Sequence, residues 1–219
     1  MFLYYITDRS GFEGTETQQC AALLRTVADV AHAGVDYIQL REKDLPAREL
    51  ERLAREVIRA VRDNSDTAKL LINSRSDVAL AVGADGVHLP GGELAASDVR
   101  ELWRRCSKTG PLIGVSAHTT GEVHCAESQG ANFAVLAPIF EKVQAAMAGM
   151  GVEALRVACA GSQAADDQEA RLHFPVLALG GVSLLNARSC IEAGAAGVAG
   201  IRLFQQGHVF ETVRQLRQL

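Results

Sequence analysis

A short pattern recurs along the chain and limits the folds that it can adopt. Each copy ends a helix-forming stretch with a glycine and continues into a short apolar run: GVDYIQL from residue 34, GADGVHL from 83, GANFAVL from 130 and GAAGVAG from 194. A glycine at the end of a helix lets the chain turn through a left-handed conformation. An apolar run of this length is typical of a strand buried on both faces. Repeated helix-then-strand units indicate an α/β protein with a parallel sheet.

Eight strands are predicted, with amphipathic helical stretches between them. The strands are expected at 2–6, 35–40, 69–72, 86–89, 112–115, 133–136, 175–179 and 197–200. The clearest helix covers 46–62, because Pro46 suits a first turn and the apolar residues that follow recur at helical spacing. Eight strand–helix units in 219 residues predict an α/β protein that is a single (β/α)8 TIM barrel.

The main alternative architecture is a doubly wound open sheet. That fold would carry a glycine-rich turn directly after its first strand, but the segment at 7–10 reads TDRS. No linker rich in proline or serine divides the chain, so one domain over 1–219 is the simplest organisation. The stretches 141–151 and 160–170 are polar or rich in small residues and are predicted to be loops.

Composition and charge narrow the class of protein. The formal net charge is −4 and Lys and Arg form no run, so the sequence lacks the basic patch expected of a nucleic-acid-binding protein. No apolar stretch reaches the length of a membrane span, and the first eight residues do not read as a signal peptide. The five scattered cysteines argue against a disulfide framework and a zinc site. We therefore expect a cytoplasmic protein; its oligomeric state stays open, a homo-oligomer included.

Two cations follow the second predicted strand, where a barrel carries its functional residues. Alternation puts Gln39, Arg41 and Lys43 on one side of the chain, which is the inner side if the leucine at position 40 faces the helices. Cations that converge there would form an anion clamp, because arginine binds a phosphate through two parallel donors and lysine adds a point charge. The competing interpretation is a surface salt-bridge cluster with Glu42 and Asp44.

The loops after the last two strands form a second candidate site. Gly180 and Gly181 follow the seventh predicted strand; Gly200 ends the eighth, and Ile201 follows it. These two loops are the recurrent phosphate site of such barrels, and glycine lets backbone amides approach phosphate oxygens closely. The competing interpretation is a pair of tight turns. Together the two candidate sites predict that the partners are small phosphorylated molecules.

Further polar residues follow the third to sixth strands. Asn73 and Ser74 suit either a helix cap or a ligand contact. His88 lies within the fourth strand, and a lone histidine at such a position is more often a packed core residue than a catalyst. Glu93 is the one carboxylate near it, and one carboxylate makes a weak Mg²⁺ site. The remaining candidates are Ser116, which suits a helix cap or a substrate contact, and His118 and Lys142.

Six segments resemble the thiamine-phosphate synthase superfamily, which includes the synthases and the TenI-type thiazole tautomerases. They run in order along nearly the whole chain: YYITD (4–8), YIQLREKD (37–44), GADGVHL (83–89), GVSAH (114–118), PIF (138–140) and ALGGV (178–182). The resemblance implies a transferase that couples hydroxymethylpyrimidine diphosphate to thiazole phosphate, with Mg²⁺ as its cofactor.

The resemblance also implies roles for individual residues. The family holds its diphosphate with residues that map onto Gln39, Arg41, Lys43 and Asn73. Its glycines for the thiazole phosphate map onto Gly181 and Gly200. The candidate catalytic residues are therefore Arg41, Lys43 and Ser116. The candidate substrate-binding residues are Gln39, Asn73, His88, His118, Lys142, Gly180, Gly181, Gly200 and Ile201.

The chain departs from both branches of the superfamily. Ser74 stands where a synthase has a Mg²⁺-binding Asp, and Glu93 replaces a second Asp. The segment after the sixth strand lacks the synthase Thr-x-Thr-Lys, for which Lys142 is a partial substitute. Pro138 stands where a tautomerase has its catalytic His. A degenerate metal site predicts weak or absent turnover with phosphate binding kept, because losing a group that supports a site costs activity by about 10- to 1000-fold.

Two other functions stay open. The first is a TenI-like isomerase acting on thiazole phosphate, with His118 or His88 as the proton carrier. The second is a non-catalytic regulatory barrel that binds thiazole phosphate. All three interpretations require that Arg41 and Gly181 lie at the same end of the molecule.

Overall fold

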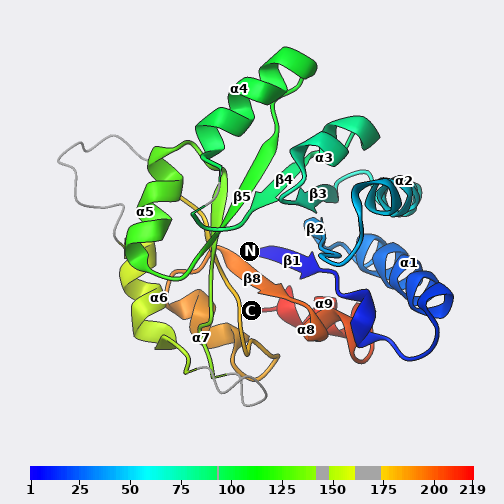
Figure 1. The fold of residues 1–219 in the computed structure, drawn as a ribbon. Coiled ribbons are helices and arrows are strands. Elements are labelled where there is room, and N and C mark those ends of the chain that lie inside the picture. The colour runs from blue at the N-terminus through cyan, green and yellow to red at the C-terminus, as the bar shows by residue number, and fades with distance from the viewer. Residues whose placement is uncertain (93, 142–147, 161–173) are drawn as a thin grey trace.

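Eight parallel strands form a closed barrel in the computed structural model, which describes residues 1–92, 94–141, 148–160 and 174–219 (Figure 1). The strands are β1 (Phe2–Ile6), β2 (Tyr37–Leu40), β3 (Lys69–Asn73), β4 (Gly86–Leu89), β5 (Leu112–Ala117), β6 (Phe133–Leu136), β7 (Val176–Ala178) and β8 (Gly197–Gly200). Each strand pairs in parallel with the next, and β8 pairs with β1. The predicted (β/α)8 barrel is therefore confirmed, and an open sheet is excluded because no edge remains.

The helices lie outside the barrel, where Figure 1 shows them around the strands. They are α1 (Glu16–His32), α2 (Ala47–Asn64), α3 (Ser76–Val82), α4 (Ala96–Cys106), α5 (Thr120–Ser128), α6 (Gly151–Ala160), α7 (Ala187–Glu192), α8 (Arg202–Gln205) and α9 (Val209–Leu216). A short 3₁₀ helix, η1 (Arg9–Gly11), follows β1. Within the described ranges, none of the helices has both the length and the apolar character needed to cross a lipid bilayer.

Several predicted bounds differ from those of the structure. The second strand starts at Tyr37 rather than at 35, because the N–H of Val35 donates to the carbonyl of Val30 and still belongs to the end of α1. The seventh strand, predicted at 175–179, is shorter. The third and fifth strands run on past 72 and 115, since their last residues pair with β4 and β6.

The predicted helix 46–62 and the two predicted loops also need correction. Pro46 is the N-cap of α2 and lies before its first turn, and the helix runs two residues past 62. Within 141–151, residues 142–147 lie outside the described residues, and Gly151 already begins α6. Of 160–170, only Ala160 is described, and it ends α6.

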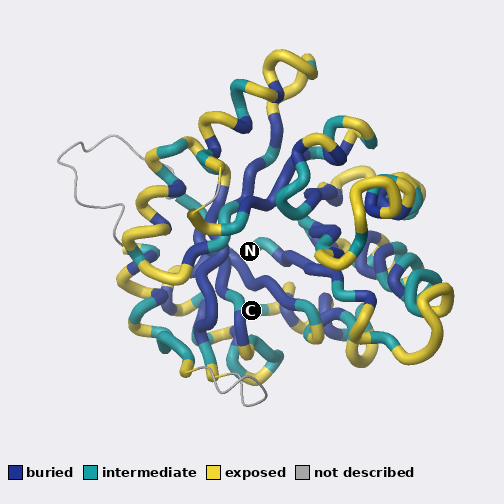
Figure 2. Tube along the Cα trace, in the orientation of Figure 1, coloured by how far each residue is buried: buried dark blue, intermediate teal, exposed yellow. Residues whose placement is uncertain are grey.

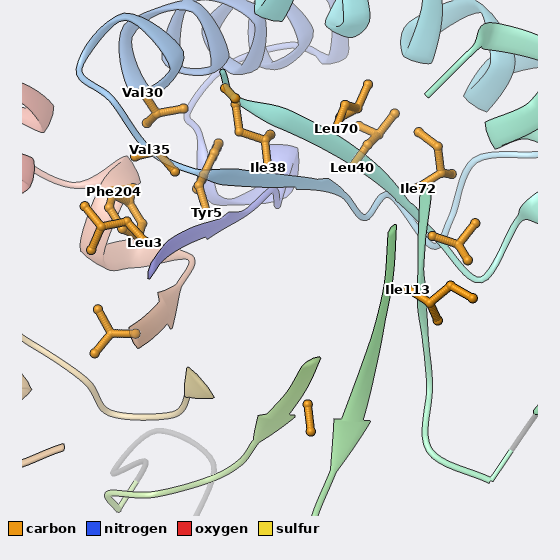
Figure 3. Close-up of a cluster of buried hydrophobic side chains, with 14 of the residues drawn as sticks. Leu3, Tyr5, Val30, Val35, Ile38, Leu40, Leu70, Ile72, Ile113 and Phe204 are labelled. Atoms are coloured by element: carbon orange, nitrogen blue, oxygen red, sulfur yellow. The ribbon is translucent and has the colours of Figure 1, made fainter. Parts of the chain in front are cut away.

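Alternate residues of each strand point to opposite sides of the sheet and build two apolar clusters. The outer cluster lies between the barrel and the helices and includes the residues labelled in Figure 3. The inner cluster fills the barrel and contains Tyr4, Ile6, Leu71, Phe133, Val135, Leu177 and Ala199. Figure 2 shows the resulting distribution, with buried strands and with helices exposed on their outer sides. The barrel interior is thus a packed core and not a channel.

The repeat has a structural role at two positions. Its glycines take the left-handed conformation predicted for them, with φ of 92°, 69°, 79° and 97° at Gly34, Gly83, Gly130 and Gly194. Two positions further on, the repeat holds Asp36, Asp85, Asn132 and, in the fourth copy, Ala196.

The side chain of each of the first three accepts a hydrogen bond from a backbone N–H of the preceding strand, at 2.7, 2.8 and 2.9 Å. The donors are Leu3, Leu70 and Ile113. Each of the three also accepts from an arginine of the helical layer, and these arginines are Arg217, Arg62 and Arg100. Polar side chains at the amino ends of the even strands therefore join neighbouring strands to the helices.

Candidate functional site

One hollow in the described part of the protein lies at the amino ends of the strands. It has a volume of about 690 Å³ and is lined by residues such as Phe2, Lys69 and Leu112. Its carboxylates, Asp36 and Asp85, already accept hydrogen bonds from strand amides and arginines. This end of the barrel stabilises the fold, and the candidate site lies at the carboxyl ends of the strands, where barrels of this kind carry their function.

Gln39, near the end of β2, faces the inside of the barrel as predicted. Gln39 is buried and pairs in register with Ile6 of the inner cluster, whereas Leu40 belongs to the outer cluster. Alternation continued past the strand directs Arg41 toward the barrel mouth. The backbone N–H of Arg41 donates to the hydroxyl of Thr7 at 3.0 Å, which holds the end of β2 against the end of β1.

The salt-bridge cluster considered from the sequence exists, but its cation was wrongly assigned. Glu42 and Asp44 bind Arg9, with Nη1 of Arg9 at 3.1 Å from Oε2 of Glu42 and Nη2 at 2.5 Å from Oδ2 of Asp44. The hydroxyl of Thr7 also donates to Glu42, at 2.6 Å. Neither Arg41 nor Lys43 pairs with a carboxylate in the described part of the chain. Their charges are therefore available to a ligand.

Burial and pairing act in opposite directions on the two carboxyls that hold Arg9. The side chain of Glu42 is 2% exposed, and this burial raises the pKa of Glu42 although Thr7 and Arg9 donate to it. Asp44 is exposed, and the hydrogen bond from Arg9 lowers the pKa of Asp44. This network fixes the chain on both sides of Arg41 and Lys43.

A chain of buried polar side chains crosses the barrel below the mouth. Nε2 of Gln39 donates to the hydroxyl of Tyr4 at 2.8 Å, and that hydroxyl lies 3.1 Å from Nδ1 of His88. Nε2 of His88 lies 2.9 Å from the hydroxyl of Ser116. Burial, with a smaller contribution from the charge of Arg41, lowers the pKa of His88 to about 3, so its imidazole is neutral. His88 is a core residue, as its type suggests, but one engaged at both nitrogens.

The glycines after β7 and β8 line a small hollow of about 170 Å³ at the same end of the barrel. Gly180 and Gly181 both have positive φ, at 94° and 66°. A Cβ on Gly181 would lie 2.8 Å from Cβ of Phe140, so only glycine fits this turn. The side chain of Asn186 donates to the carbonyl of Gly181 at 3.0 Å. The N–H groups of Gly180 and Gly181 donate to no backbone carbonyl within the described residues.

Gly200 and Ile201 line the same small hollow. Since all strands are parallel, the residues that follow β2 and those that follow β7 and β8 lie at one end of the barrel. The requirement that Arg41 and Gly181 share an end of the molecule is thereby met. A tight turn and a ligand site are compatible here, because the turn pairs neither amide with a backbone carbonyl of the described residues.

Asn73 and Ser74 lie at the end of β3 and do not cap α3. The N-cap of α3 is Arg75, which makes no capping hydrogen bond from its side chain, so the capping interpretation is wrong. Instead, Nδ2 of Asn73 donates to the hydroxyl of Ser74 at 3.0 Å. Ser74 has a φ of 59°, a left-handed conformation that few residues other than glycine adopt.

The residues that the structure describes do not fit a Mg²⁺ ion held by carboxylates. Ser74 offers a hydroxyl where a carboxylate was needed, and the described residues contain no group of three or more His, Cys, Asp or Glu side chains that could hold a metal. Glu93 lies outside the described residues, and so does Lys142.

The two candidates after β5 differ in their surroundings. Ser116 lies within the strand and bonds to His88; α5 is capped by Thr119, so the capping interpretation of Ser116 is also wrong. His118 is exposed, and its Nδ1 lies 2.8 Å from the carbonyl of Ala137. Because a carbonyl only accepts, Nδ1 of His118 donates this hydrogen bond, and Nε2 makes no hydrogen bond within the described residues.

Sequence reasoning missed three residues that organise the site, namely Tyr4, Thr7 and Arg9. All three belong to β1 or the turn after it and contact residues more than 30 positions away. The signal that the sequence offers for Thr7 and Arg9 is the polar segment TDRS directly after β1.

Cationic and polar residues from β2 to β5 thus face glycine loops from β7 and β8 across one mouth of a closed barrel. This arrangement defines a (β/α)8 barrel whose candidate site lies at the carboxyl ends of its strands. Comparison with known proteins gives the particular family. A family model described as thiamine monophosphate synthase matches residues 3–204, and the chain belongs to this family.

Individual relatives agree with the family. The chain is 43% identical over 199 residues to "Putative thiamine-phosphate synthase" of Geobacter sulfurreducens, covering 90% of this chain and 83% of that protein. It is 36% identical over 201 residues to thiamine-phosphate synthase of Moorella thermoacetica, covering 90% and 87%. Thiamine phosphate pyrophosphorylase from Pyrococcus furiosus has a similar solved structure, with a TM-score of 0.77, 27% identity and coverage of 99% and 94%. The resemblance of the six sequence segments is confirmed.

Proposed function

We propose that the protein is a transferase of the thiamine-phosphate synthase type, which couples hydroxymethylpyrimidine diphosphate to thiazole phosphate. The observation that carries this proposal is the state of the two cations after β2. Arg9 takes the carboxylates of Glu42 and Asp44, so Arg41 and Lys43 keep their charge for an anion at the mouth. Family membership and the names of the relatives support the same activity.

The residues divide the work between the two phosphorylated substrates. Arg41 and Lys43, with Asn73 and Ser116 beside them, bind the diphosphate and stabilise the negative charge that grows on it as its bond to the pyrimidine methylene carbon breaks. The electron pair of that bond leaves with the diphosphate oxygen. The thiazole nitrogen then donates its own pair to the carbon, which forms the new bond.

The glycine loops hold the second substrate in place. The amides of Gly180 and Gly181, which donate to no backbone carbonyl among the described residues, and the hollow lined by Gly200 and Ile201 suit a single phosphate group. A phosphate bound there directs the thiazole across the mouth toward the diphosphate site. Positioning of this kind accounts for a large share of catalysis in a two-substrate reaction.

The test mixes the protein with both substrates and Mg²⁺ and measures thiamine phosphate. Arg41→Ala should lower the affinity for the diphosphate more than tenfold, because a hydrogen bond to a charged group contributes about 1.5 to 3 kcal/mol. Arg59→Ala is the matched control, since Arg59 is exposed on α2 and donates to the carbonyl of Arg55. Equal affinity of the two variants would refute the clamp.

A blank assay would leave the two other functions, which ligand titration separates. Binding of thiazole phosphate without product would identify a binding barrel, and proton exchange on the thiazole carboxylate would identify an isomerase. The structure favours His118 over His88 as the proton carrier in that case, because both nitrogens of His88 are engaged within the barrel. If neither substrate binds, the proposal fails.

A further inference from the structure

Four side chains from four strands form one continuous hydrogen-bonded series through the barrel. It runs from Gln39 to Tyr4 at 2.8 Å, from Tyr4 to His88 at 3.1 Å and from His88 to Ser116 at 2.9 Å. Gln39, Tyr4 and His88 are buried, and Ser116 is half-buried near the carboxyl end of β5. The series therefore connects the closed interior of the barrel to its mouth.

The number of protons in the series fixes the direction of each hydrogen bond. Nε2 of Gln39 can only donate, so the oxygen of Tyr4 accepts. The single proton of that phenol has one remaining acceptor within reach, Nδ1 of His88. A neutral imidazole that accepts at Nδ1 carries its proton at Nε2, which then donates to Ser116.

The opposite direction leaves a buried group unsatisfied. If Nδ1 of His88 carried the proton, the oxygen of Tyr4 would accept twice and its own proton would have no partner in the barrel. A buried donor without a partner is costly. The position of the His88 ring also depends on a glycine at 114, because a Cβ there would lie 2.8 Å from Nδ1 of His88.

The end of the series is a hydroxyl with a free proton. Ser116 accepts from His88, and the described residues offer the Ser116 proton no acceptor in return. Its position at the carboxyl end of β5 places that proton at the mouth, in the same opening as Arg41. A serine that accepts from histidine cannot also be deprotonated by it, which distinguishes this pair from the serine–histidine pair of a hydrolase.

We propose that Gln39, Tyr4 and His88 are positioning residues that make the Ser116 hydroxyl a fixed donor to an acceptor atom of the bound ligand. The identity of that atom, a diphosphate oxygen, rests on the proposed function. The direction of the series does not. In this arrangement Ser116 donates to charge that already stands on the ligand, and takes no part as a nucleophile.

The test compares Tyr4→Phe with Tyr5→Phe. Both remove one buried phenol oxygen, but the hydroxyl of Tyr5 has no hydrogen-bond partner among the described residues, and Tyr5 belongs to the outer cluster. The first readout is the ¹⁵N spectrum of the His88 imidazole in the free protein. We expect the proton on Nε2 in the wild type and in Tyr5→Phe, and a mixture of both forms in Tyr4→Phe.

The second readout is the affinity for pyrophosphate. Ser116→Ala should weaken it about tenfold, since one hydrogen bond to a charged group is lost. Tyr4→Phe should weaken it about threefold or more, and adding Tyr4→Phe to Ser116→Ala should have no further effect if both act through the same donor. Tyr5→Phe should bind as the wild type does. Thermal unfolding checks that each variant is folded.

The outcomes separate this inference from the proposed function. A proton on Nδ1 of His88 in the wild type would overturn the inference, whatever binds. So would Tyr4→Phe if it changed the imidazole but left the affinity for pyrophosphate intact. If pyrophosphate fails to bind the wild type, the proposed function fails, and the position of the imidazole proton still supports or overturns the direction of the series.

Discussion

Arg9 separates the acidic from the basic residues of the REKD segment that follows β2. Its guanidinium binds Glu42 and Asp44, while its backbone N–H donates to the same carboxylate of Glu42 at 3.2 Å. Glu42 is buried, so its charge depends on these contacts. A residue in the turn after β1 therefore pairs with the two carboxylates after β2 and leaves Arg41 and Lys43 without a carboxylate partner in the described residues.

Removal of Arg9 should destabilise the fold strongly. Arg9→Ala leaves the buried carboxylate of Glu42 without its cation, and breaking a buried pair on one side costs about 3 to 5 kcal/mol. Urea unfolding at neutral pH measures the free energy of unfolding. Arg75→Ala is the control, because its partner Asp77 is exposed and such pairs contribute about 1 kcal/mol or less. A loss equal to that of the control would show that Glu42 is not stabilised by Arg9.

The same variant should show a characteristic pH dependence. Burial already raises the pKa of Glu42 in the folded protein, and Arg9 opposes this rise, so its removal raises the pKa of Glu42 further. The folded variant then takes up the proton more readily than the unfolded chain does. Its deficit in stability should be full above the raised pKa and shrink as the pH falls toward the usual range of a glutamate. A deficit that grows on acidification would contradict this account.

Ser74 occupies a backbone position that suits an acidic residue. Its φ of 59° is left-handed, a region in which Asp and Asn are several-fold enriched. Ser74→Asp should therefore be accepted without added strain and should place a carboxylate beside Asn73. We expect the rate of thiamine phosphate formation to rise in the presence of Mg²⁺.

The matched control for that gain is Ser74→Asn, which has the same backbone preference and no charge. Rates are measured with Mg²⁺ and with a chelator for both variants. An equal response of the Asp and Asn variants would show that the missing carboxylate does not limit the reaction.

Among the elements, the strands of the repeat were predictable because their signal is local. A glycine at the end of a helix and the apolar run after it lie within seven residues, and strands such as β4 were placed at their true bounds. The hydrogen bonds that build the site were not predictable, since Tyr4 and His88 are 84 positions apart and meet only when the barrel closes. The same holds for Arg9 and Glu42, whose pairing reassigns the charges of the second strand.

The side chain two positions after the repeat glycine should contribute measurably to stability. Asp85→Ala removes the acceptor for the N–H of Leu70 and the partner of Arg62 and Lys69. An unsatisfied buried donor costs about 1 to 3 kcal/mol, so chemical unfolding should detect a loss of that size. Asp77→Ala, at an exposed position of α3, is the control and should change stability by less. Equal effects would show that the tie between β3 and β4 is not needed.

The proposed function requires two anion sites on different parts of one mouth, and this has a thermodynamic consequence for the whole molecule. Each ligand that binds only the folded protein raises the free energy of unfolding, by about 2.7 kcal/mol at a hundred times its dissociation constant. Pyrophosphate near Arg41 and thiazole phosphate near Gly181 should therefore raise the unfolding temperature together more than either does alone. Thermal unfolding with each ligand and with both tests this. Mutual competition would show that the mouth holds a single anion.

Ala196 breaks the pattern of the repeat in the last quarter of the barrel. It stands where the other copies have Asp36, Asp85 or Asn132, and its methyl group offers no oxygen to the strand beside it. A hollow of about 340 Å³ borders Ala196 and is lined by Arg156, whose guanidinium pairs with Glu153 on α6 and donates to the carbonyl of Glu192 rather than to a side chain at position 196. Three of the four even strands are thus joined to the preceding strand by a polar side chain at their amino end. The fourth, β8, which ends at Gly200, has Ala196 there instead. Position 196 is therefore the place at which an introduced aspartate could add the missing hydrogen bond and stabilise this part of the barrel.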